Sequence, residues 1–258
     1  MSLSIALAGS VTGADIIRGC IRLLLPPQVL SNCARKMNKL LTKISVLAVS
    51  FVTVAAFAQD IKGDVNAGES KNAMCSGCHA IKGYQASFPE VHKVPMISGQ
   101  SAKYIVSSLN AYKKGERKHP SMRGIAETLS EQDIADLAAY YSASGVVAGA
   151  APLADKPSKE PSAQVQALLA KANCSSCHGA NYGKPIDPSY PKLGGQHADY
   201  LFVALKAYKV DGNAKVGRNN AIMAGMAKQY TNAELKLMAN YLSSLEGNLK
   251  TVTQSRFR

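Results

Sequence analysis

Two short cysteine motifs have the spacing of a cofactor attachment site. They read CSGCH, starting at Cys75, and CSSCH, starting at Cys174. Two thiols three positions apart can each add to one vinyl group of the same porphyrin, and the adjacent histidine is then held beneath the iron. The pattern therefore predicts two covalent haem c groups. The predicted attachment residues are Cys75, Cys78, Cys174 and Cys177, and the predicted axial histidines are His79 and His178.

The same cysteine spacing occurs in redox dithiols and in halves of zinc sites. A structural zinc ion takes four Cys or His ligands, and no further pair recurs at ligand spacing beside both motifs. A thioredoxin-like dithiol stands in a strand–helix context that this sequence lacks. Because the whole motif is duplicated, histidine included, haem is the favoured interpretation.

The two motifs belong to a tandem repeat. The segment PMISGQSAKYIVSSLNAYK, starting at Pro95, matches PKLGGQHADYLFVALKAYK, starting at Pro191. Likewise SMRGIAETLSEQDIADLAAYYS, from Ser121, matches IMAGMAKQYTNAELKLMANYLS, from Ile222. Each unit is small for a self-sufficient core, and a large apolar cofactor would supply the missing buried surface. The duplication predicts two similar domains.

The repeat also selects a candidate for the sixth ligand of each iron. Of the methionines and histidines beyond the motifs, only Met122 and Met223 occupy equivalent positions in the two units. We expect both in polar, glycine-containing loops. Met226, close behind Met223, is the alternative hardest to exclude. A His/Met haem has no open coordination position and a raised reduction potential, which favours an electron carrier over an enzyme.

Helices are the elements expected to position these residues. The expected helices span 67–74, 102–114, 164–172 and 198–209. A further helix in each unit begins with a capping-box pattern at Ser130 or Thr231 and continues with apolar residues at i, i+3, i+4 and i+7. No segment sustains an alternation of period two, so the predicted fold class is all-α, without a substantial sheet.

The N-terminal part of the chain has the pattern of an export signal. From Met37, a basic segment, an apolar run and an Ala-x-Ala site follow one another. The apolar run is shorter than the roughly 20 residues of a membrane span, and an uncleaved anchor is the alternative. We interpret residues 1–36 as an extension from a start codon assigned too far upstream. The predicted organisation is then the extension 1–36, a signal peptide 37–58, an N-terminal domain 59–145, a linker 146–162 and a C-terminal domain 163–258, in the periplasm.

The chain is basic, with 30 Lys and Arg against 17 Asp and Glu and a formal net charge of +13. No nucleic-acid-binding motif accompanies this charge, so nucleic acid is not an expected partner. The densest basic segment is KKGERKH, residues 113–119. One interpretation is that its Lys113, Lys114, Arg117 and Lys118 steer the protein toward an acidic redox partner. The other is an ordinary solvated loop.

The sequence resembles the dihaem cytochrome c4 family over nearly all of residues 59–248. The resemblance is carried by the paired C-x-x-C-H motifs, the P-x-[IL]-x-G-Q segments and the Met-x-G-x-A stretches. It implies two class I cytochrome c domains related by a pseudo-twofold axis, each enclosing one covalent haem, with Met122 and Met223 as distal ligands. Pro95 and Pro191 match the family's proline, whose carbonyl would accept the second imidazole N–H.

The resemblance also implies partners, namely a quinol:cytochrome c oxidoreductase as electron donor and a haem–copper oxidase as acceptor. Two other functions compete with this one. The chain could serve as the haem subunit of a periplasmic dehydrogenase, such as a sulfide-oxidising flavocytochrome, or as a dihaem peroxidase in which one haem must open. The stretch 80–94 departs from the family's Gly/Asn-rich loop. Whether the mature protein associates loosely with the membrane is left open by the sequence.

Overall fold

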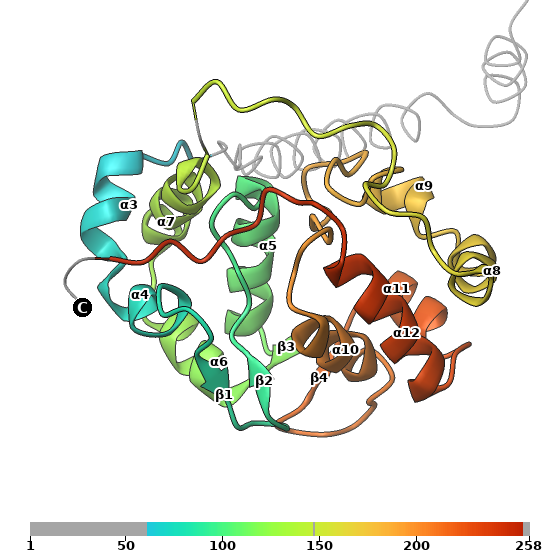
Figure 1. Ribbon diagram of the computed structural model, residues 1–258. Helices are drawn as coiled ribbons and strands as arrows, with labels where there is room; N and C mark the ends of the chain where they lie inside the picture. Colours follow the sequence, from blue (N-terminus) through green and yellow to red (C-terminus); the bar gives the residue numbers. More distant parts are fainter. Residues whose placement is uncertain (1–60, 147, 255–258) are drawn as a thin grey trace, which may run out of the picture. The chain divides into compact units, whose positions relative to one another are not determined.

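The computed structural model describes residues 61–146 and 148–254 (Figure 1). The predicted extension and signal peptide lie outside the described residues. No helix in the described ranges is long and apolar enough to cross a membrane.

The described chain is built from two sets of helices. The N-terminal repeat contains α3 (Val65–Lys71), α4 (Ala73–His79), α5 (Ala102–Lys113), α6 (Pro120–Glu127) and α7 (Glu131–Ala143). The C-terminal repeat contains α8 (Ala163–Ala172), α9 (Ser175–His178), α10 (Ala198–Ala207), α11 (Ala221–Ala227) and α12 (Asn232–Ser243). The strands are two residues each: β1 (Gln85–Ala86), β2 (His92–Lys93), β3 (Arg117–Lys118) and β4 (Gly217–Arg218). The all-α prediction is confirmed.

The two capping patterns form the predicted helix starts. The Ser130 hydroxyl accepts the Asp133 N–H, while the Asp133 carboxylate accepts the Ser130 N–H, and Thr231 and Glu234 form the same reciprocal pair. These bonds satisfy backbone donors that the first turn of a helix leaves without partners. The apolar positions of the spacing pattern are buried in α7 and α12, so each of these two helices forms the centre of one core.

Helix α3 is fixed closely against α7. The Asp136 carboxylate accepts the Asp64 N–H at 2.8 Å and the Lys71 ammonium at 2.6 Å. A Cβ at Gly68 would lie 2.1 Å from the backbone carbonyl oxygen of Asp136, so only glycine allows this approach. The helix that leads into the first cysteine motif is therefore held by one buried carboxylate and one glycine.

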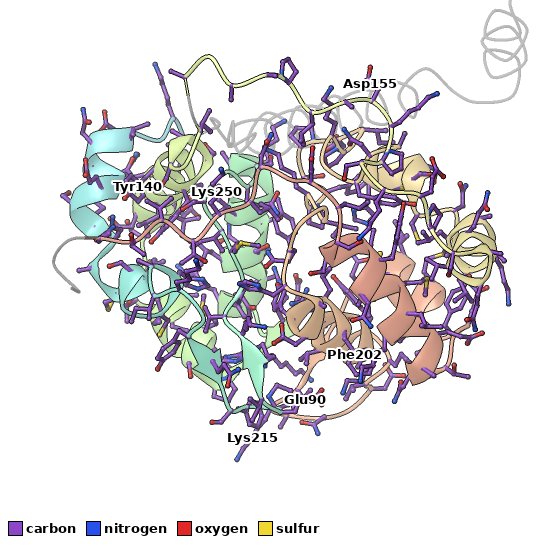
Figure 2. The ribbon with its side chains drawn as sticks, in the orientation of Figure 1. Glu90, Tyr140, Asp155, Phe202, Lys215 and Lys250 are labelled. Carbon is purple, nitrogen blue, oxygen red and sulfur yellow. The ribbon has the colours of Figure 1, made fainter. Side chains whose placement is uncertain are left out.

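The stretch 80–94, the departure from the usual loop, forms the β1–β2 hairpin and contacts the other repeat. The Lys93 N–H donates to the Asp199 carboxylate at 3.0 Å. Glu90, labelled in Figure 2, forms an ion pair with Lys206 of α10. This hairpin is therefore an element that joins the two repeats.

The segment after α12 returns to the N-terminal repeat. The Lys250 N–H donates to the Ser98 carbonyl at 3.0 Å, and the Gln254 amide donates to the Tyr140 hydroxyl at 3.2 Å. Tyr140 and Lys250 are both labelled in Figure 2. The C-terminal segment therefore ties the second repeat to the first.

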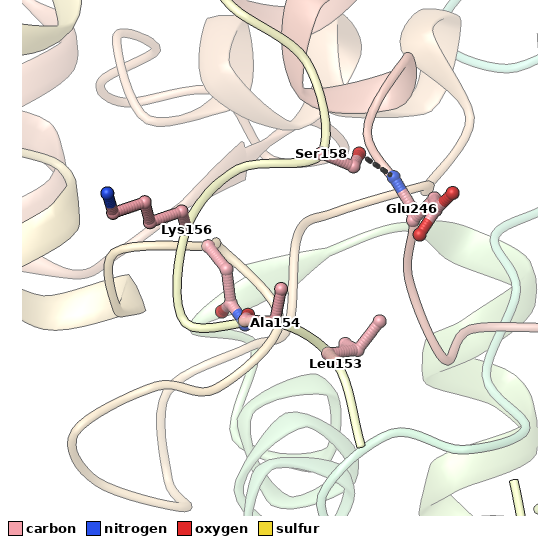
Figure 3. Close-up of a pocket in the computed structure, with 6 residues that line it drawn as sticks. Leu153, Ala154, Lys156, Ser158 and Glu246 are labelled. Carbon is pink, nitrogen blue, oxygen red and sulfur yellow. Dashed lines mark hydrogen bonds between the residues drawn. The ribbon is translucent and has the colours of Figure 1, made fainter. Parts of the chain in front are cut away.

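Between α7 and α8 the described residues form no helix or strand. The segment is held to the C-terminal repeat where the Glu246 N–H donates to the Ser158 hydroxyl at 2.7 Å (Figure 3). The pocket beside this bond, lined by Leu153, Ala154 and Lys156 among others, has a volume of about 20 Å³. Such a volume accommodates about one water molecule, so this pocket is no cofactor site.

Candidate haem sites

The two motif histidines make the same hydrogen bond. The Nδ1–H of His79 donates to the Pro95 carbonyl oxygen at 2.8 Å, and the Nδ1–H of His178 donates to the Pro191 carbonyl oxygen at 3.0 Å. A carbonyl oxygen can only accept, so Nδ1 carries the hydrogen and Nε2 keeps its lone pair. Burial lowers the pKa of both imidazoles. Each histidine thus has the neutral form and the fixed orientation that an axial iron ligand requires.

The four motif cysteines form no disulfide. Cys75 packs against the N-terminal core and Cys174 against the C-terminal core. Burial raises the pKa of the Cys75 thiol and raises that of Cys174 to about 11. A half-buried, uncharged sulfur suits a thioether.

Met122 and Met223 are equivalent in structure as well as in sequence. Each is the third residue of a short helix, Met122 in α6 and Met223 in α11. The Met122 N–H donates to His119 Nδ1 at 3.4 Å, and the Met223 N–H donates to Asn220 Oδ1 at 2.9 Å. Both methionines are half-buried.

The expectation that these methionines lie in loops was wrong. Glycine lowers helix propensity, and Gly124 and Gly225 stand in the middle of segments too short to show a helical period. The side chains of His119 and Asn220 supply the missing signal, because each accepts an N–H of the first turn and starts the helix.

The alternative ligand Met226 has a different place. Its side chain packs against the C-terminal core cluster, and Met223 does not belong to that cluster. A methionine that fills a core is occupied with packing. The structure therefore favours Met223 over Met226 as the candidate ligand.

The basic segment 113–119 is largely engaged within the molecule. The Lys113 ammonium donates to the Leu129 carbonyl at 2.5 Å, and the Lys118 ammonium donates to the Asn213 carbonyl of the other repeat at 2.5 Å. Arg117 pairs through β3 with Arg218 of β4. Only Lys114 of the four cations is exposed. Three of the four proposed docking cations are therefore engaged within the molecule, and docking through this segment stays a prediction in which Lys114 is the exposed cation.

Arg117 and Arg218 lie among tyrosines where the repeats meet. The Arg218 guanidinium donates to the Tyr200 hydroxyl at 3.0 Å, and that of Arg117 reaches the same oxygen at 3.4 Å. Arg117 also lies 4.8 Å from the Tyr112 ring centroid, and Arg218 lies 5.5 Å from that of Tyr208. The two arginines are matched positions of the repeat, a signal that sequence analysis did not use.

These arginines fit a group that brings its own negative charge. Among the described residues, no carboxylate forms an ion pair with either guanidinium, and the buried Arg117 Nε has no hydrogen-bond partner. A half-buried cation without a counter-ion is costly. Haem carries two carboxylates, so the donor set suits haem. In the same part of the chain, no cluster of three or more His, Cys, Asp or Glu side chains could hold a bare metal ion such as zinc.

Comparison with known proteins gives a consistent result. The cytochrome c family model matches residues 69–142 and again 162–246. Cytochrome c4 of Stutzerimonas stutzeri is 31% identical over 219 residues, which cover 81% of this chain and 100% of that relative. A thiosulfate dehydrogenase electron acceptor from Stutzerimonas stutzeri strain A1501 is 28% identical over 80% of this chain and 94% of its own.

A solved structure supports the same assignment. The crystal structure of reduced recombinant cytochrome c4 from Pseudomonas stutzeri aligns with a TM-score of 0.51 and 28% identity, over 71% of this chain and 100% of that one. The predicted resemblance is thus confirmed, and with it the two covalent haem c groups. This chain belongs to the dihaem cytochrome c4 family, as an electron-transfer protein with tandem cytochrome c domains.

Proposed function

We propose that this protein is a periplasmic electron carrier in which both haem irons are six-coordinate. In the N-terminal repeat the axial ligands are His79 and Met122, and in the C-terminal repeat they are His178 and Met223. One observation carries the proposal. Both histidines donate Nδ1–H to a proline carbonyl, which leaves Nε2 available to the iron. Both methionines are the third residue of equivalent capped helices.

When bound, each haem supplies a one-electron iron couple, and His/Met ligation raises its potential relative to bis-His ligation. The protein's residues would attach each haem, orient its axial histidine and balance the charge of its carboxylates. Cys75 and Cys78 would hold one porphyrin by thioethers, and Cys174 and Cys177 the other. Pro95 and Pro191 would fix the imidazole planes through their carbonyls.

Arg117 and Arg218 would balance the haem carboxylates at the junction of the repeats. Within the ranges that the structure describes, no carboxylate forms an ion pair with either arginine, which supports this role. A cation beside a haem favours the reduced state, which carries one positive charge less. The pair would therefore raise the reduction potentials of both groups.

The predicted signal peptide supports a periplasmic location, where a quinol:cytochrome c oxidoreductase would donate electrons and a haem–copper oxidase would accept them. A second candidate is the acceptor or haem subunit of a periplasmic dehydrogenase. It is supported by the similarity to a thiosulfate dehydrogenase electron acceptor.

The two candidates are separated by supplying each donor in turn. The mature holoprotein is mixed with vesicles that contain a quinol-oxidising complex and a haem–copper oxidase, and quinol-dependent oxygen uptake is recorded. In parallel, the same protein is mixed with thiosulfate dehydrogenase and thiosulfate, and haem reduction is followed. Respiratory shuttling predicts catalytic stimulation of oxygen uptake. If the protein does not stimulate oxygen uptake in the vesicles but is rapidly reduced by the dehydrogenase, respiratory shuttling is overturned in favour of the second candidate.

A further inference from the structure

Two buried glutamines hold the backbone of the opposite repeat. The Gln196 side chain accepts the Met96 N–H at 3.0 Å and donates to the Met96 carbonyl at 2.8 Å. The Gln100 side chain accepts the Lys192 N–H at 3.0 Å and donates to the Lys192 carbonyl at 3.1 Å. Both glutamines are 4% exposed. Each repeat therefore holds one residue of the other by a reciprocal amide pair.

The residue that is held directly follows the proline that orients an axial histidine. The Met96 N–H and the Pro95 C=O belong to one planar peptide group, and that C=O accepts His79 Nδ1–H. Any rotation of this plane moves both hydrogen bonds together. Gln196 of the C-terminal repeat is thereby coupled to His79 of the N-terminal repeat.

The same relation holds in the other direction. The Lys192 N–H, held by Gln100, shares a peptide plane with the Pro191 C=O, which accepts His178 Nδ1–H. Hydrogen bonds in such a chain polarise one another, so an acceptor on the N–H strengthens the C=O as an acceptor. The two chains of bonds run crosswise between the repeats.

We propose that Gln100 and Gln196 are positioning residues that set the proximal ligation of the haem in the opposite repeat. Gln196 strengthens the hydrogen bond to His79, and Gln100 strengthens the one to His178. A stronger bond at Nδ1 raises the basicity of the imidazole, which stabilises the ferric iron. Each domain thus lowers the reduction potential of its neighbour's haem, and the interface is part of both sites.

The inference rests on the proposed axial ligation, so the test first establishes that ligation. Proton NMR of the ferric, mature holoprotein reports hyperfine-shifted signals of each proximal imidazole and of each methionine methyl. Wild-type protein without those signals would refute the ligation itself. With the signals present, the glutamine variants test only the inference.

The variant Gln196→Met removes both hydrogen bonds at similar side-chain volume. We expect it to shift the His79 imidazole signals and to raise the equilibrium constant for reducing the N-terminal haem about threefold, the effect of losing part of one hydrogen bond. The His178 signals stay unchanged. We expect Gln100→Met to shift the His178 signals and to favour reduction of the C-terminal haem by the same factor.

A matched control separates positioning from simple loss of interface contacts. Ser101→Ala removes the hydrogen bond from the Ser101 hydroxyl to the Pro188 carbonyl, which also crosses between the repeats but involves neither glutamine side chain. We expect both haems to keep their signals and potentials in this variant. If Gln196→Met changes the signals and potential of the C-terminal haem, or those of both haems equally, the proposal is overturned.

Discussion

At the scale of the residue, the neutral form of each axial histidine follows from its surroundings. The histidines donate from Nδ1 to carbonyls that cannot donate back, and each methionine is the third residue of a helix capped by His119 or Asn220. Sequence comparison within the chain was enough to select Met122 and Met223. It could not exclude Met226, because the packing of that side chain against the core depends on the tertiary structure.

The first prediction concerns the sixth ligand. Met122→Ala and Met223→Ala each open one iron, so the reduced protein binds one equivalent of carbon monoxide per chain in either variant. Met226→Leu keeps the volume in the core and binds none. Visible spectra during titration with carbon monoxide measure the stoichiometry. Carbon monoxide binding by Met226→Leu, together with none by Met223→Ala, would assign the ligand to Met226.

At the scale of the element, short capped helices and close helix contacts are the features that local sequence patterns did not predict. The amphipathic helices and their capping boxes follow from local spacing and were predicted. Helices α6 and α11 were missed because a histidine or asparagine cap outweighs a central glycine in a very short segment. The contact of α3 with α7 was also beyond local patterns, because it joins residues far apart in the chain.

The second prediction tests that contact. Gly68→Ala places a Cβ against the backbone of α7, and overpacking of this kind costs about 1–3 kcal/mol. The control Ser70→Ala lies at an exposed position of the same helix, α3, where substitutions change stability by about 0.5 kcal/mol or less. Denaturant titration, followed by the visible spectrum of the N-terminal haem, measures the free energy of unfolding of both variants. Equal stability of the two variants would contradict the described packing.

The third prediction concerns acid sensitivity. The hydrogen bond from Lys71 holds the pKa of Asp136 below its ordinary value. A carboxyl whose folded pKa is depressed stabilises the fold above its unfolded pKa of about 4, and that stabilisation is lost as the pH falls through the folded pKa. We therefore expect Asp136→Asn to lower the unfolding midpoint at pH 7 and to flatten its fall toward pH 3. An unchanged pH profile in the variant would show that Asp136 makes no such contribution. Asp211→Asn, which removes an exposed ion pair with Lys228, serves as control.

At the scale of the whole molecule, the contacts between the two repeats are the features that the sequence did not predict. The repeat pattern predicted two domains, but the engaged cations and the crosswise glutamines depend on how the repeats meet. Lys118 and Arg117, which a linear pattern presents as a surface patch, bind the other repeat instead. Among the described residues, no carboxylate forms an ion pair with Arg117 or Arg218 at this junction.

The fourth prediction tests that charge. Arg218→Met removes a cation proposed to lie beside the haem carboxylates, so both reduction potentials fall, by the equivalent of about 1 kcal/mol or more. Lys114→Met removes the exposed cation of the same basic segment and leaves the potentials unchanged. Potentiometric titration of the holoproteins measures the difference. Equal potentials in the two variants would remove Arg218 from the haem environment.

The central claim is that both irons carry two protein ligands and leave no place for a substrate. The most direct measurement is the visible spectrum of the reduced, mature wild-type holoprotein before and after carbon monoxide is added. Complete His/Met ligation in both repeats predicts an unchanged spectrum. Stoichiometric binding of carbon monoxide at one haem would contradict it and would point to an enzymatic site in that repeat.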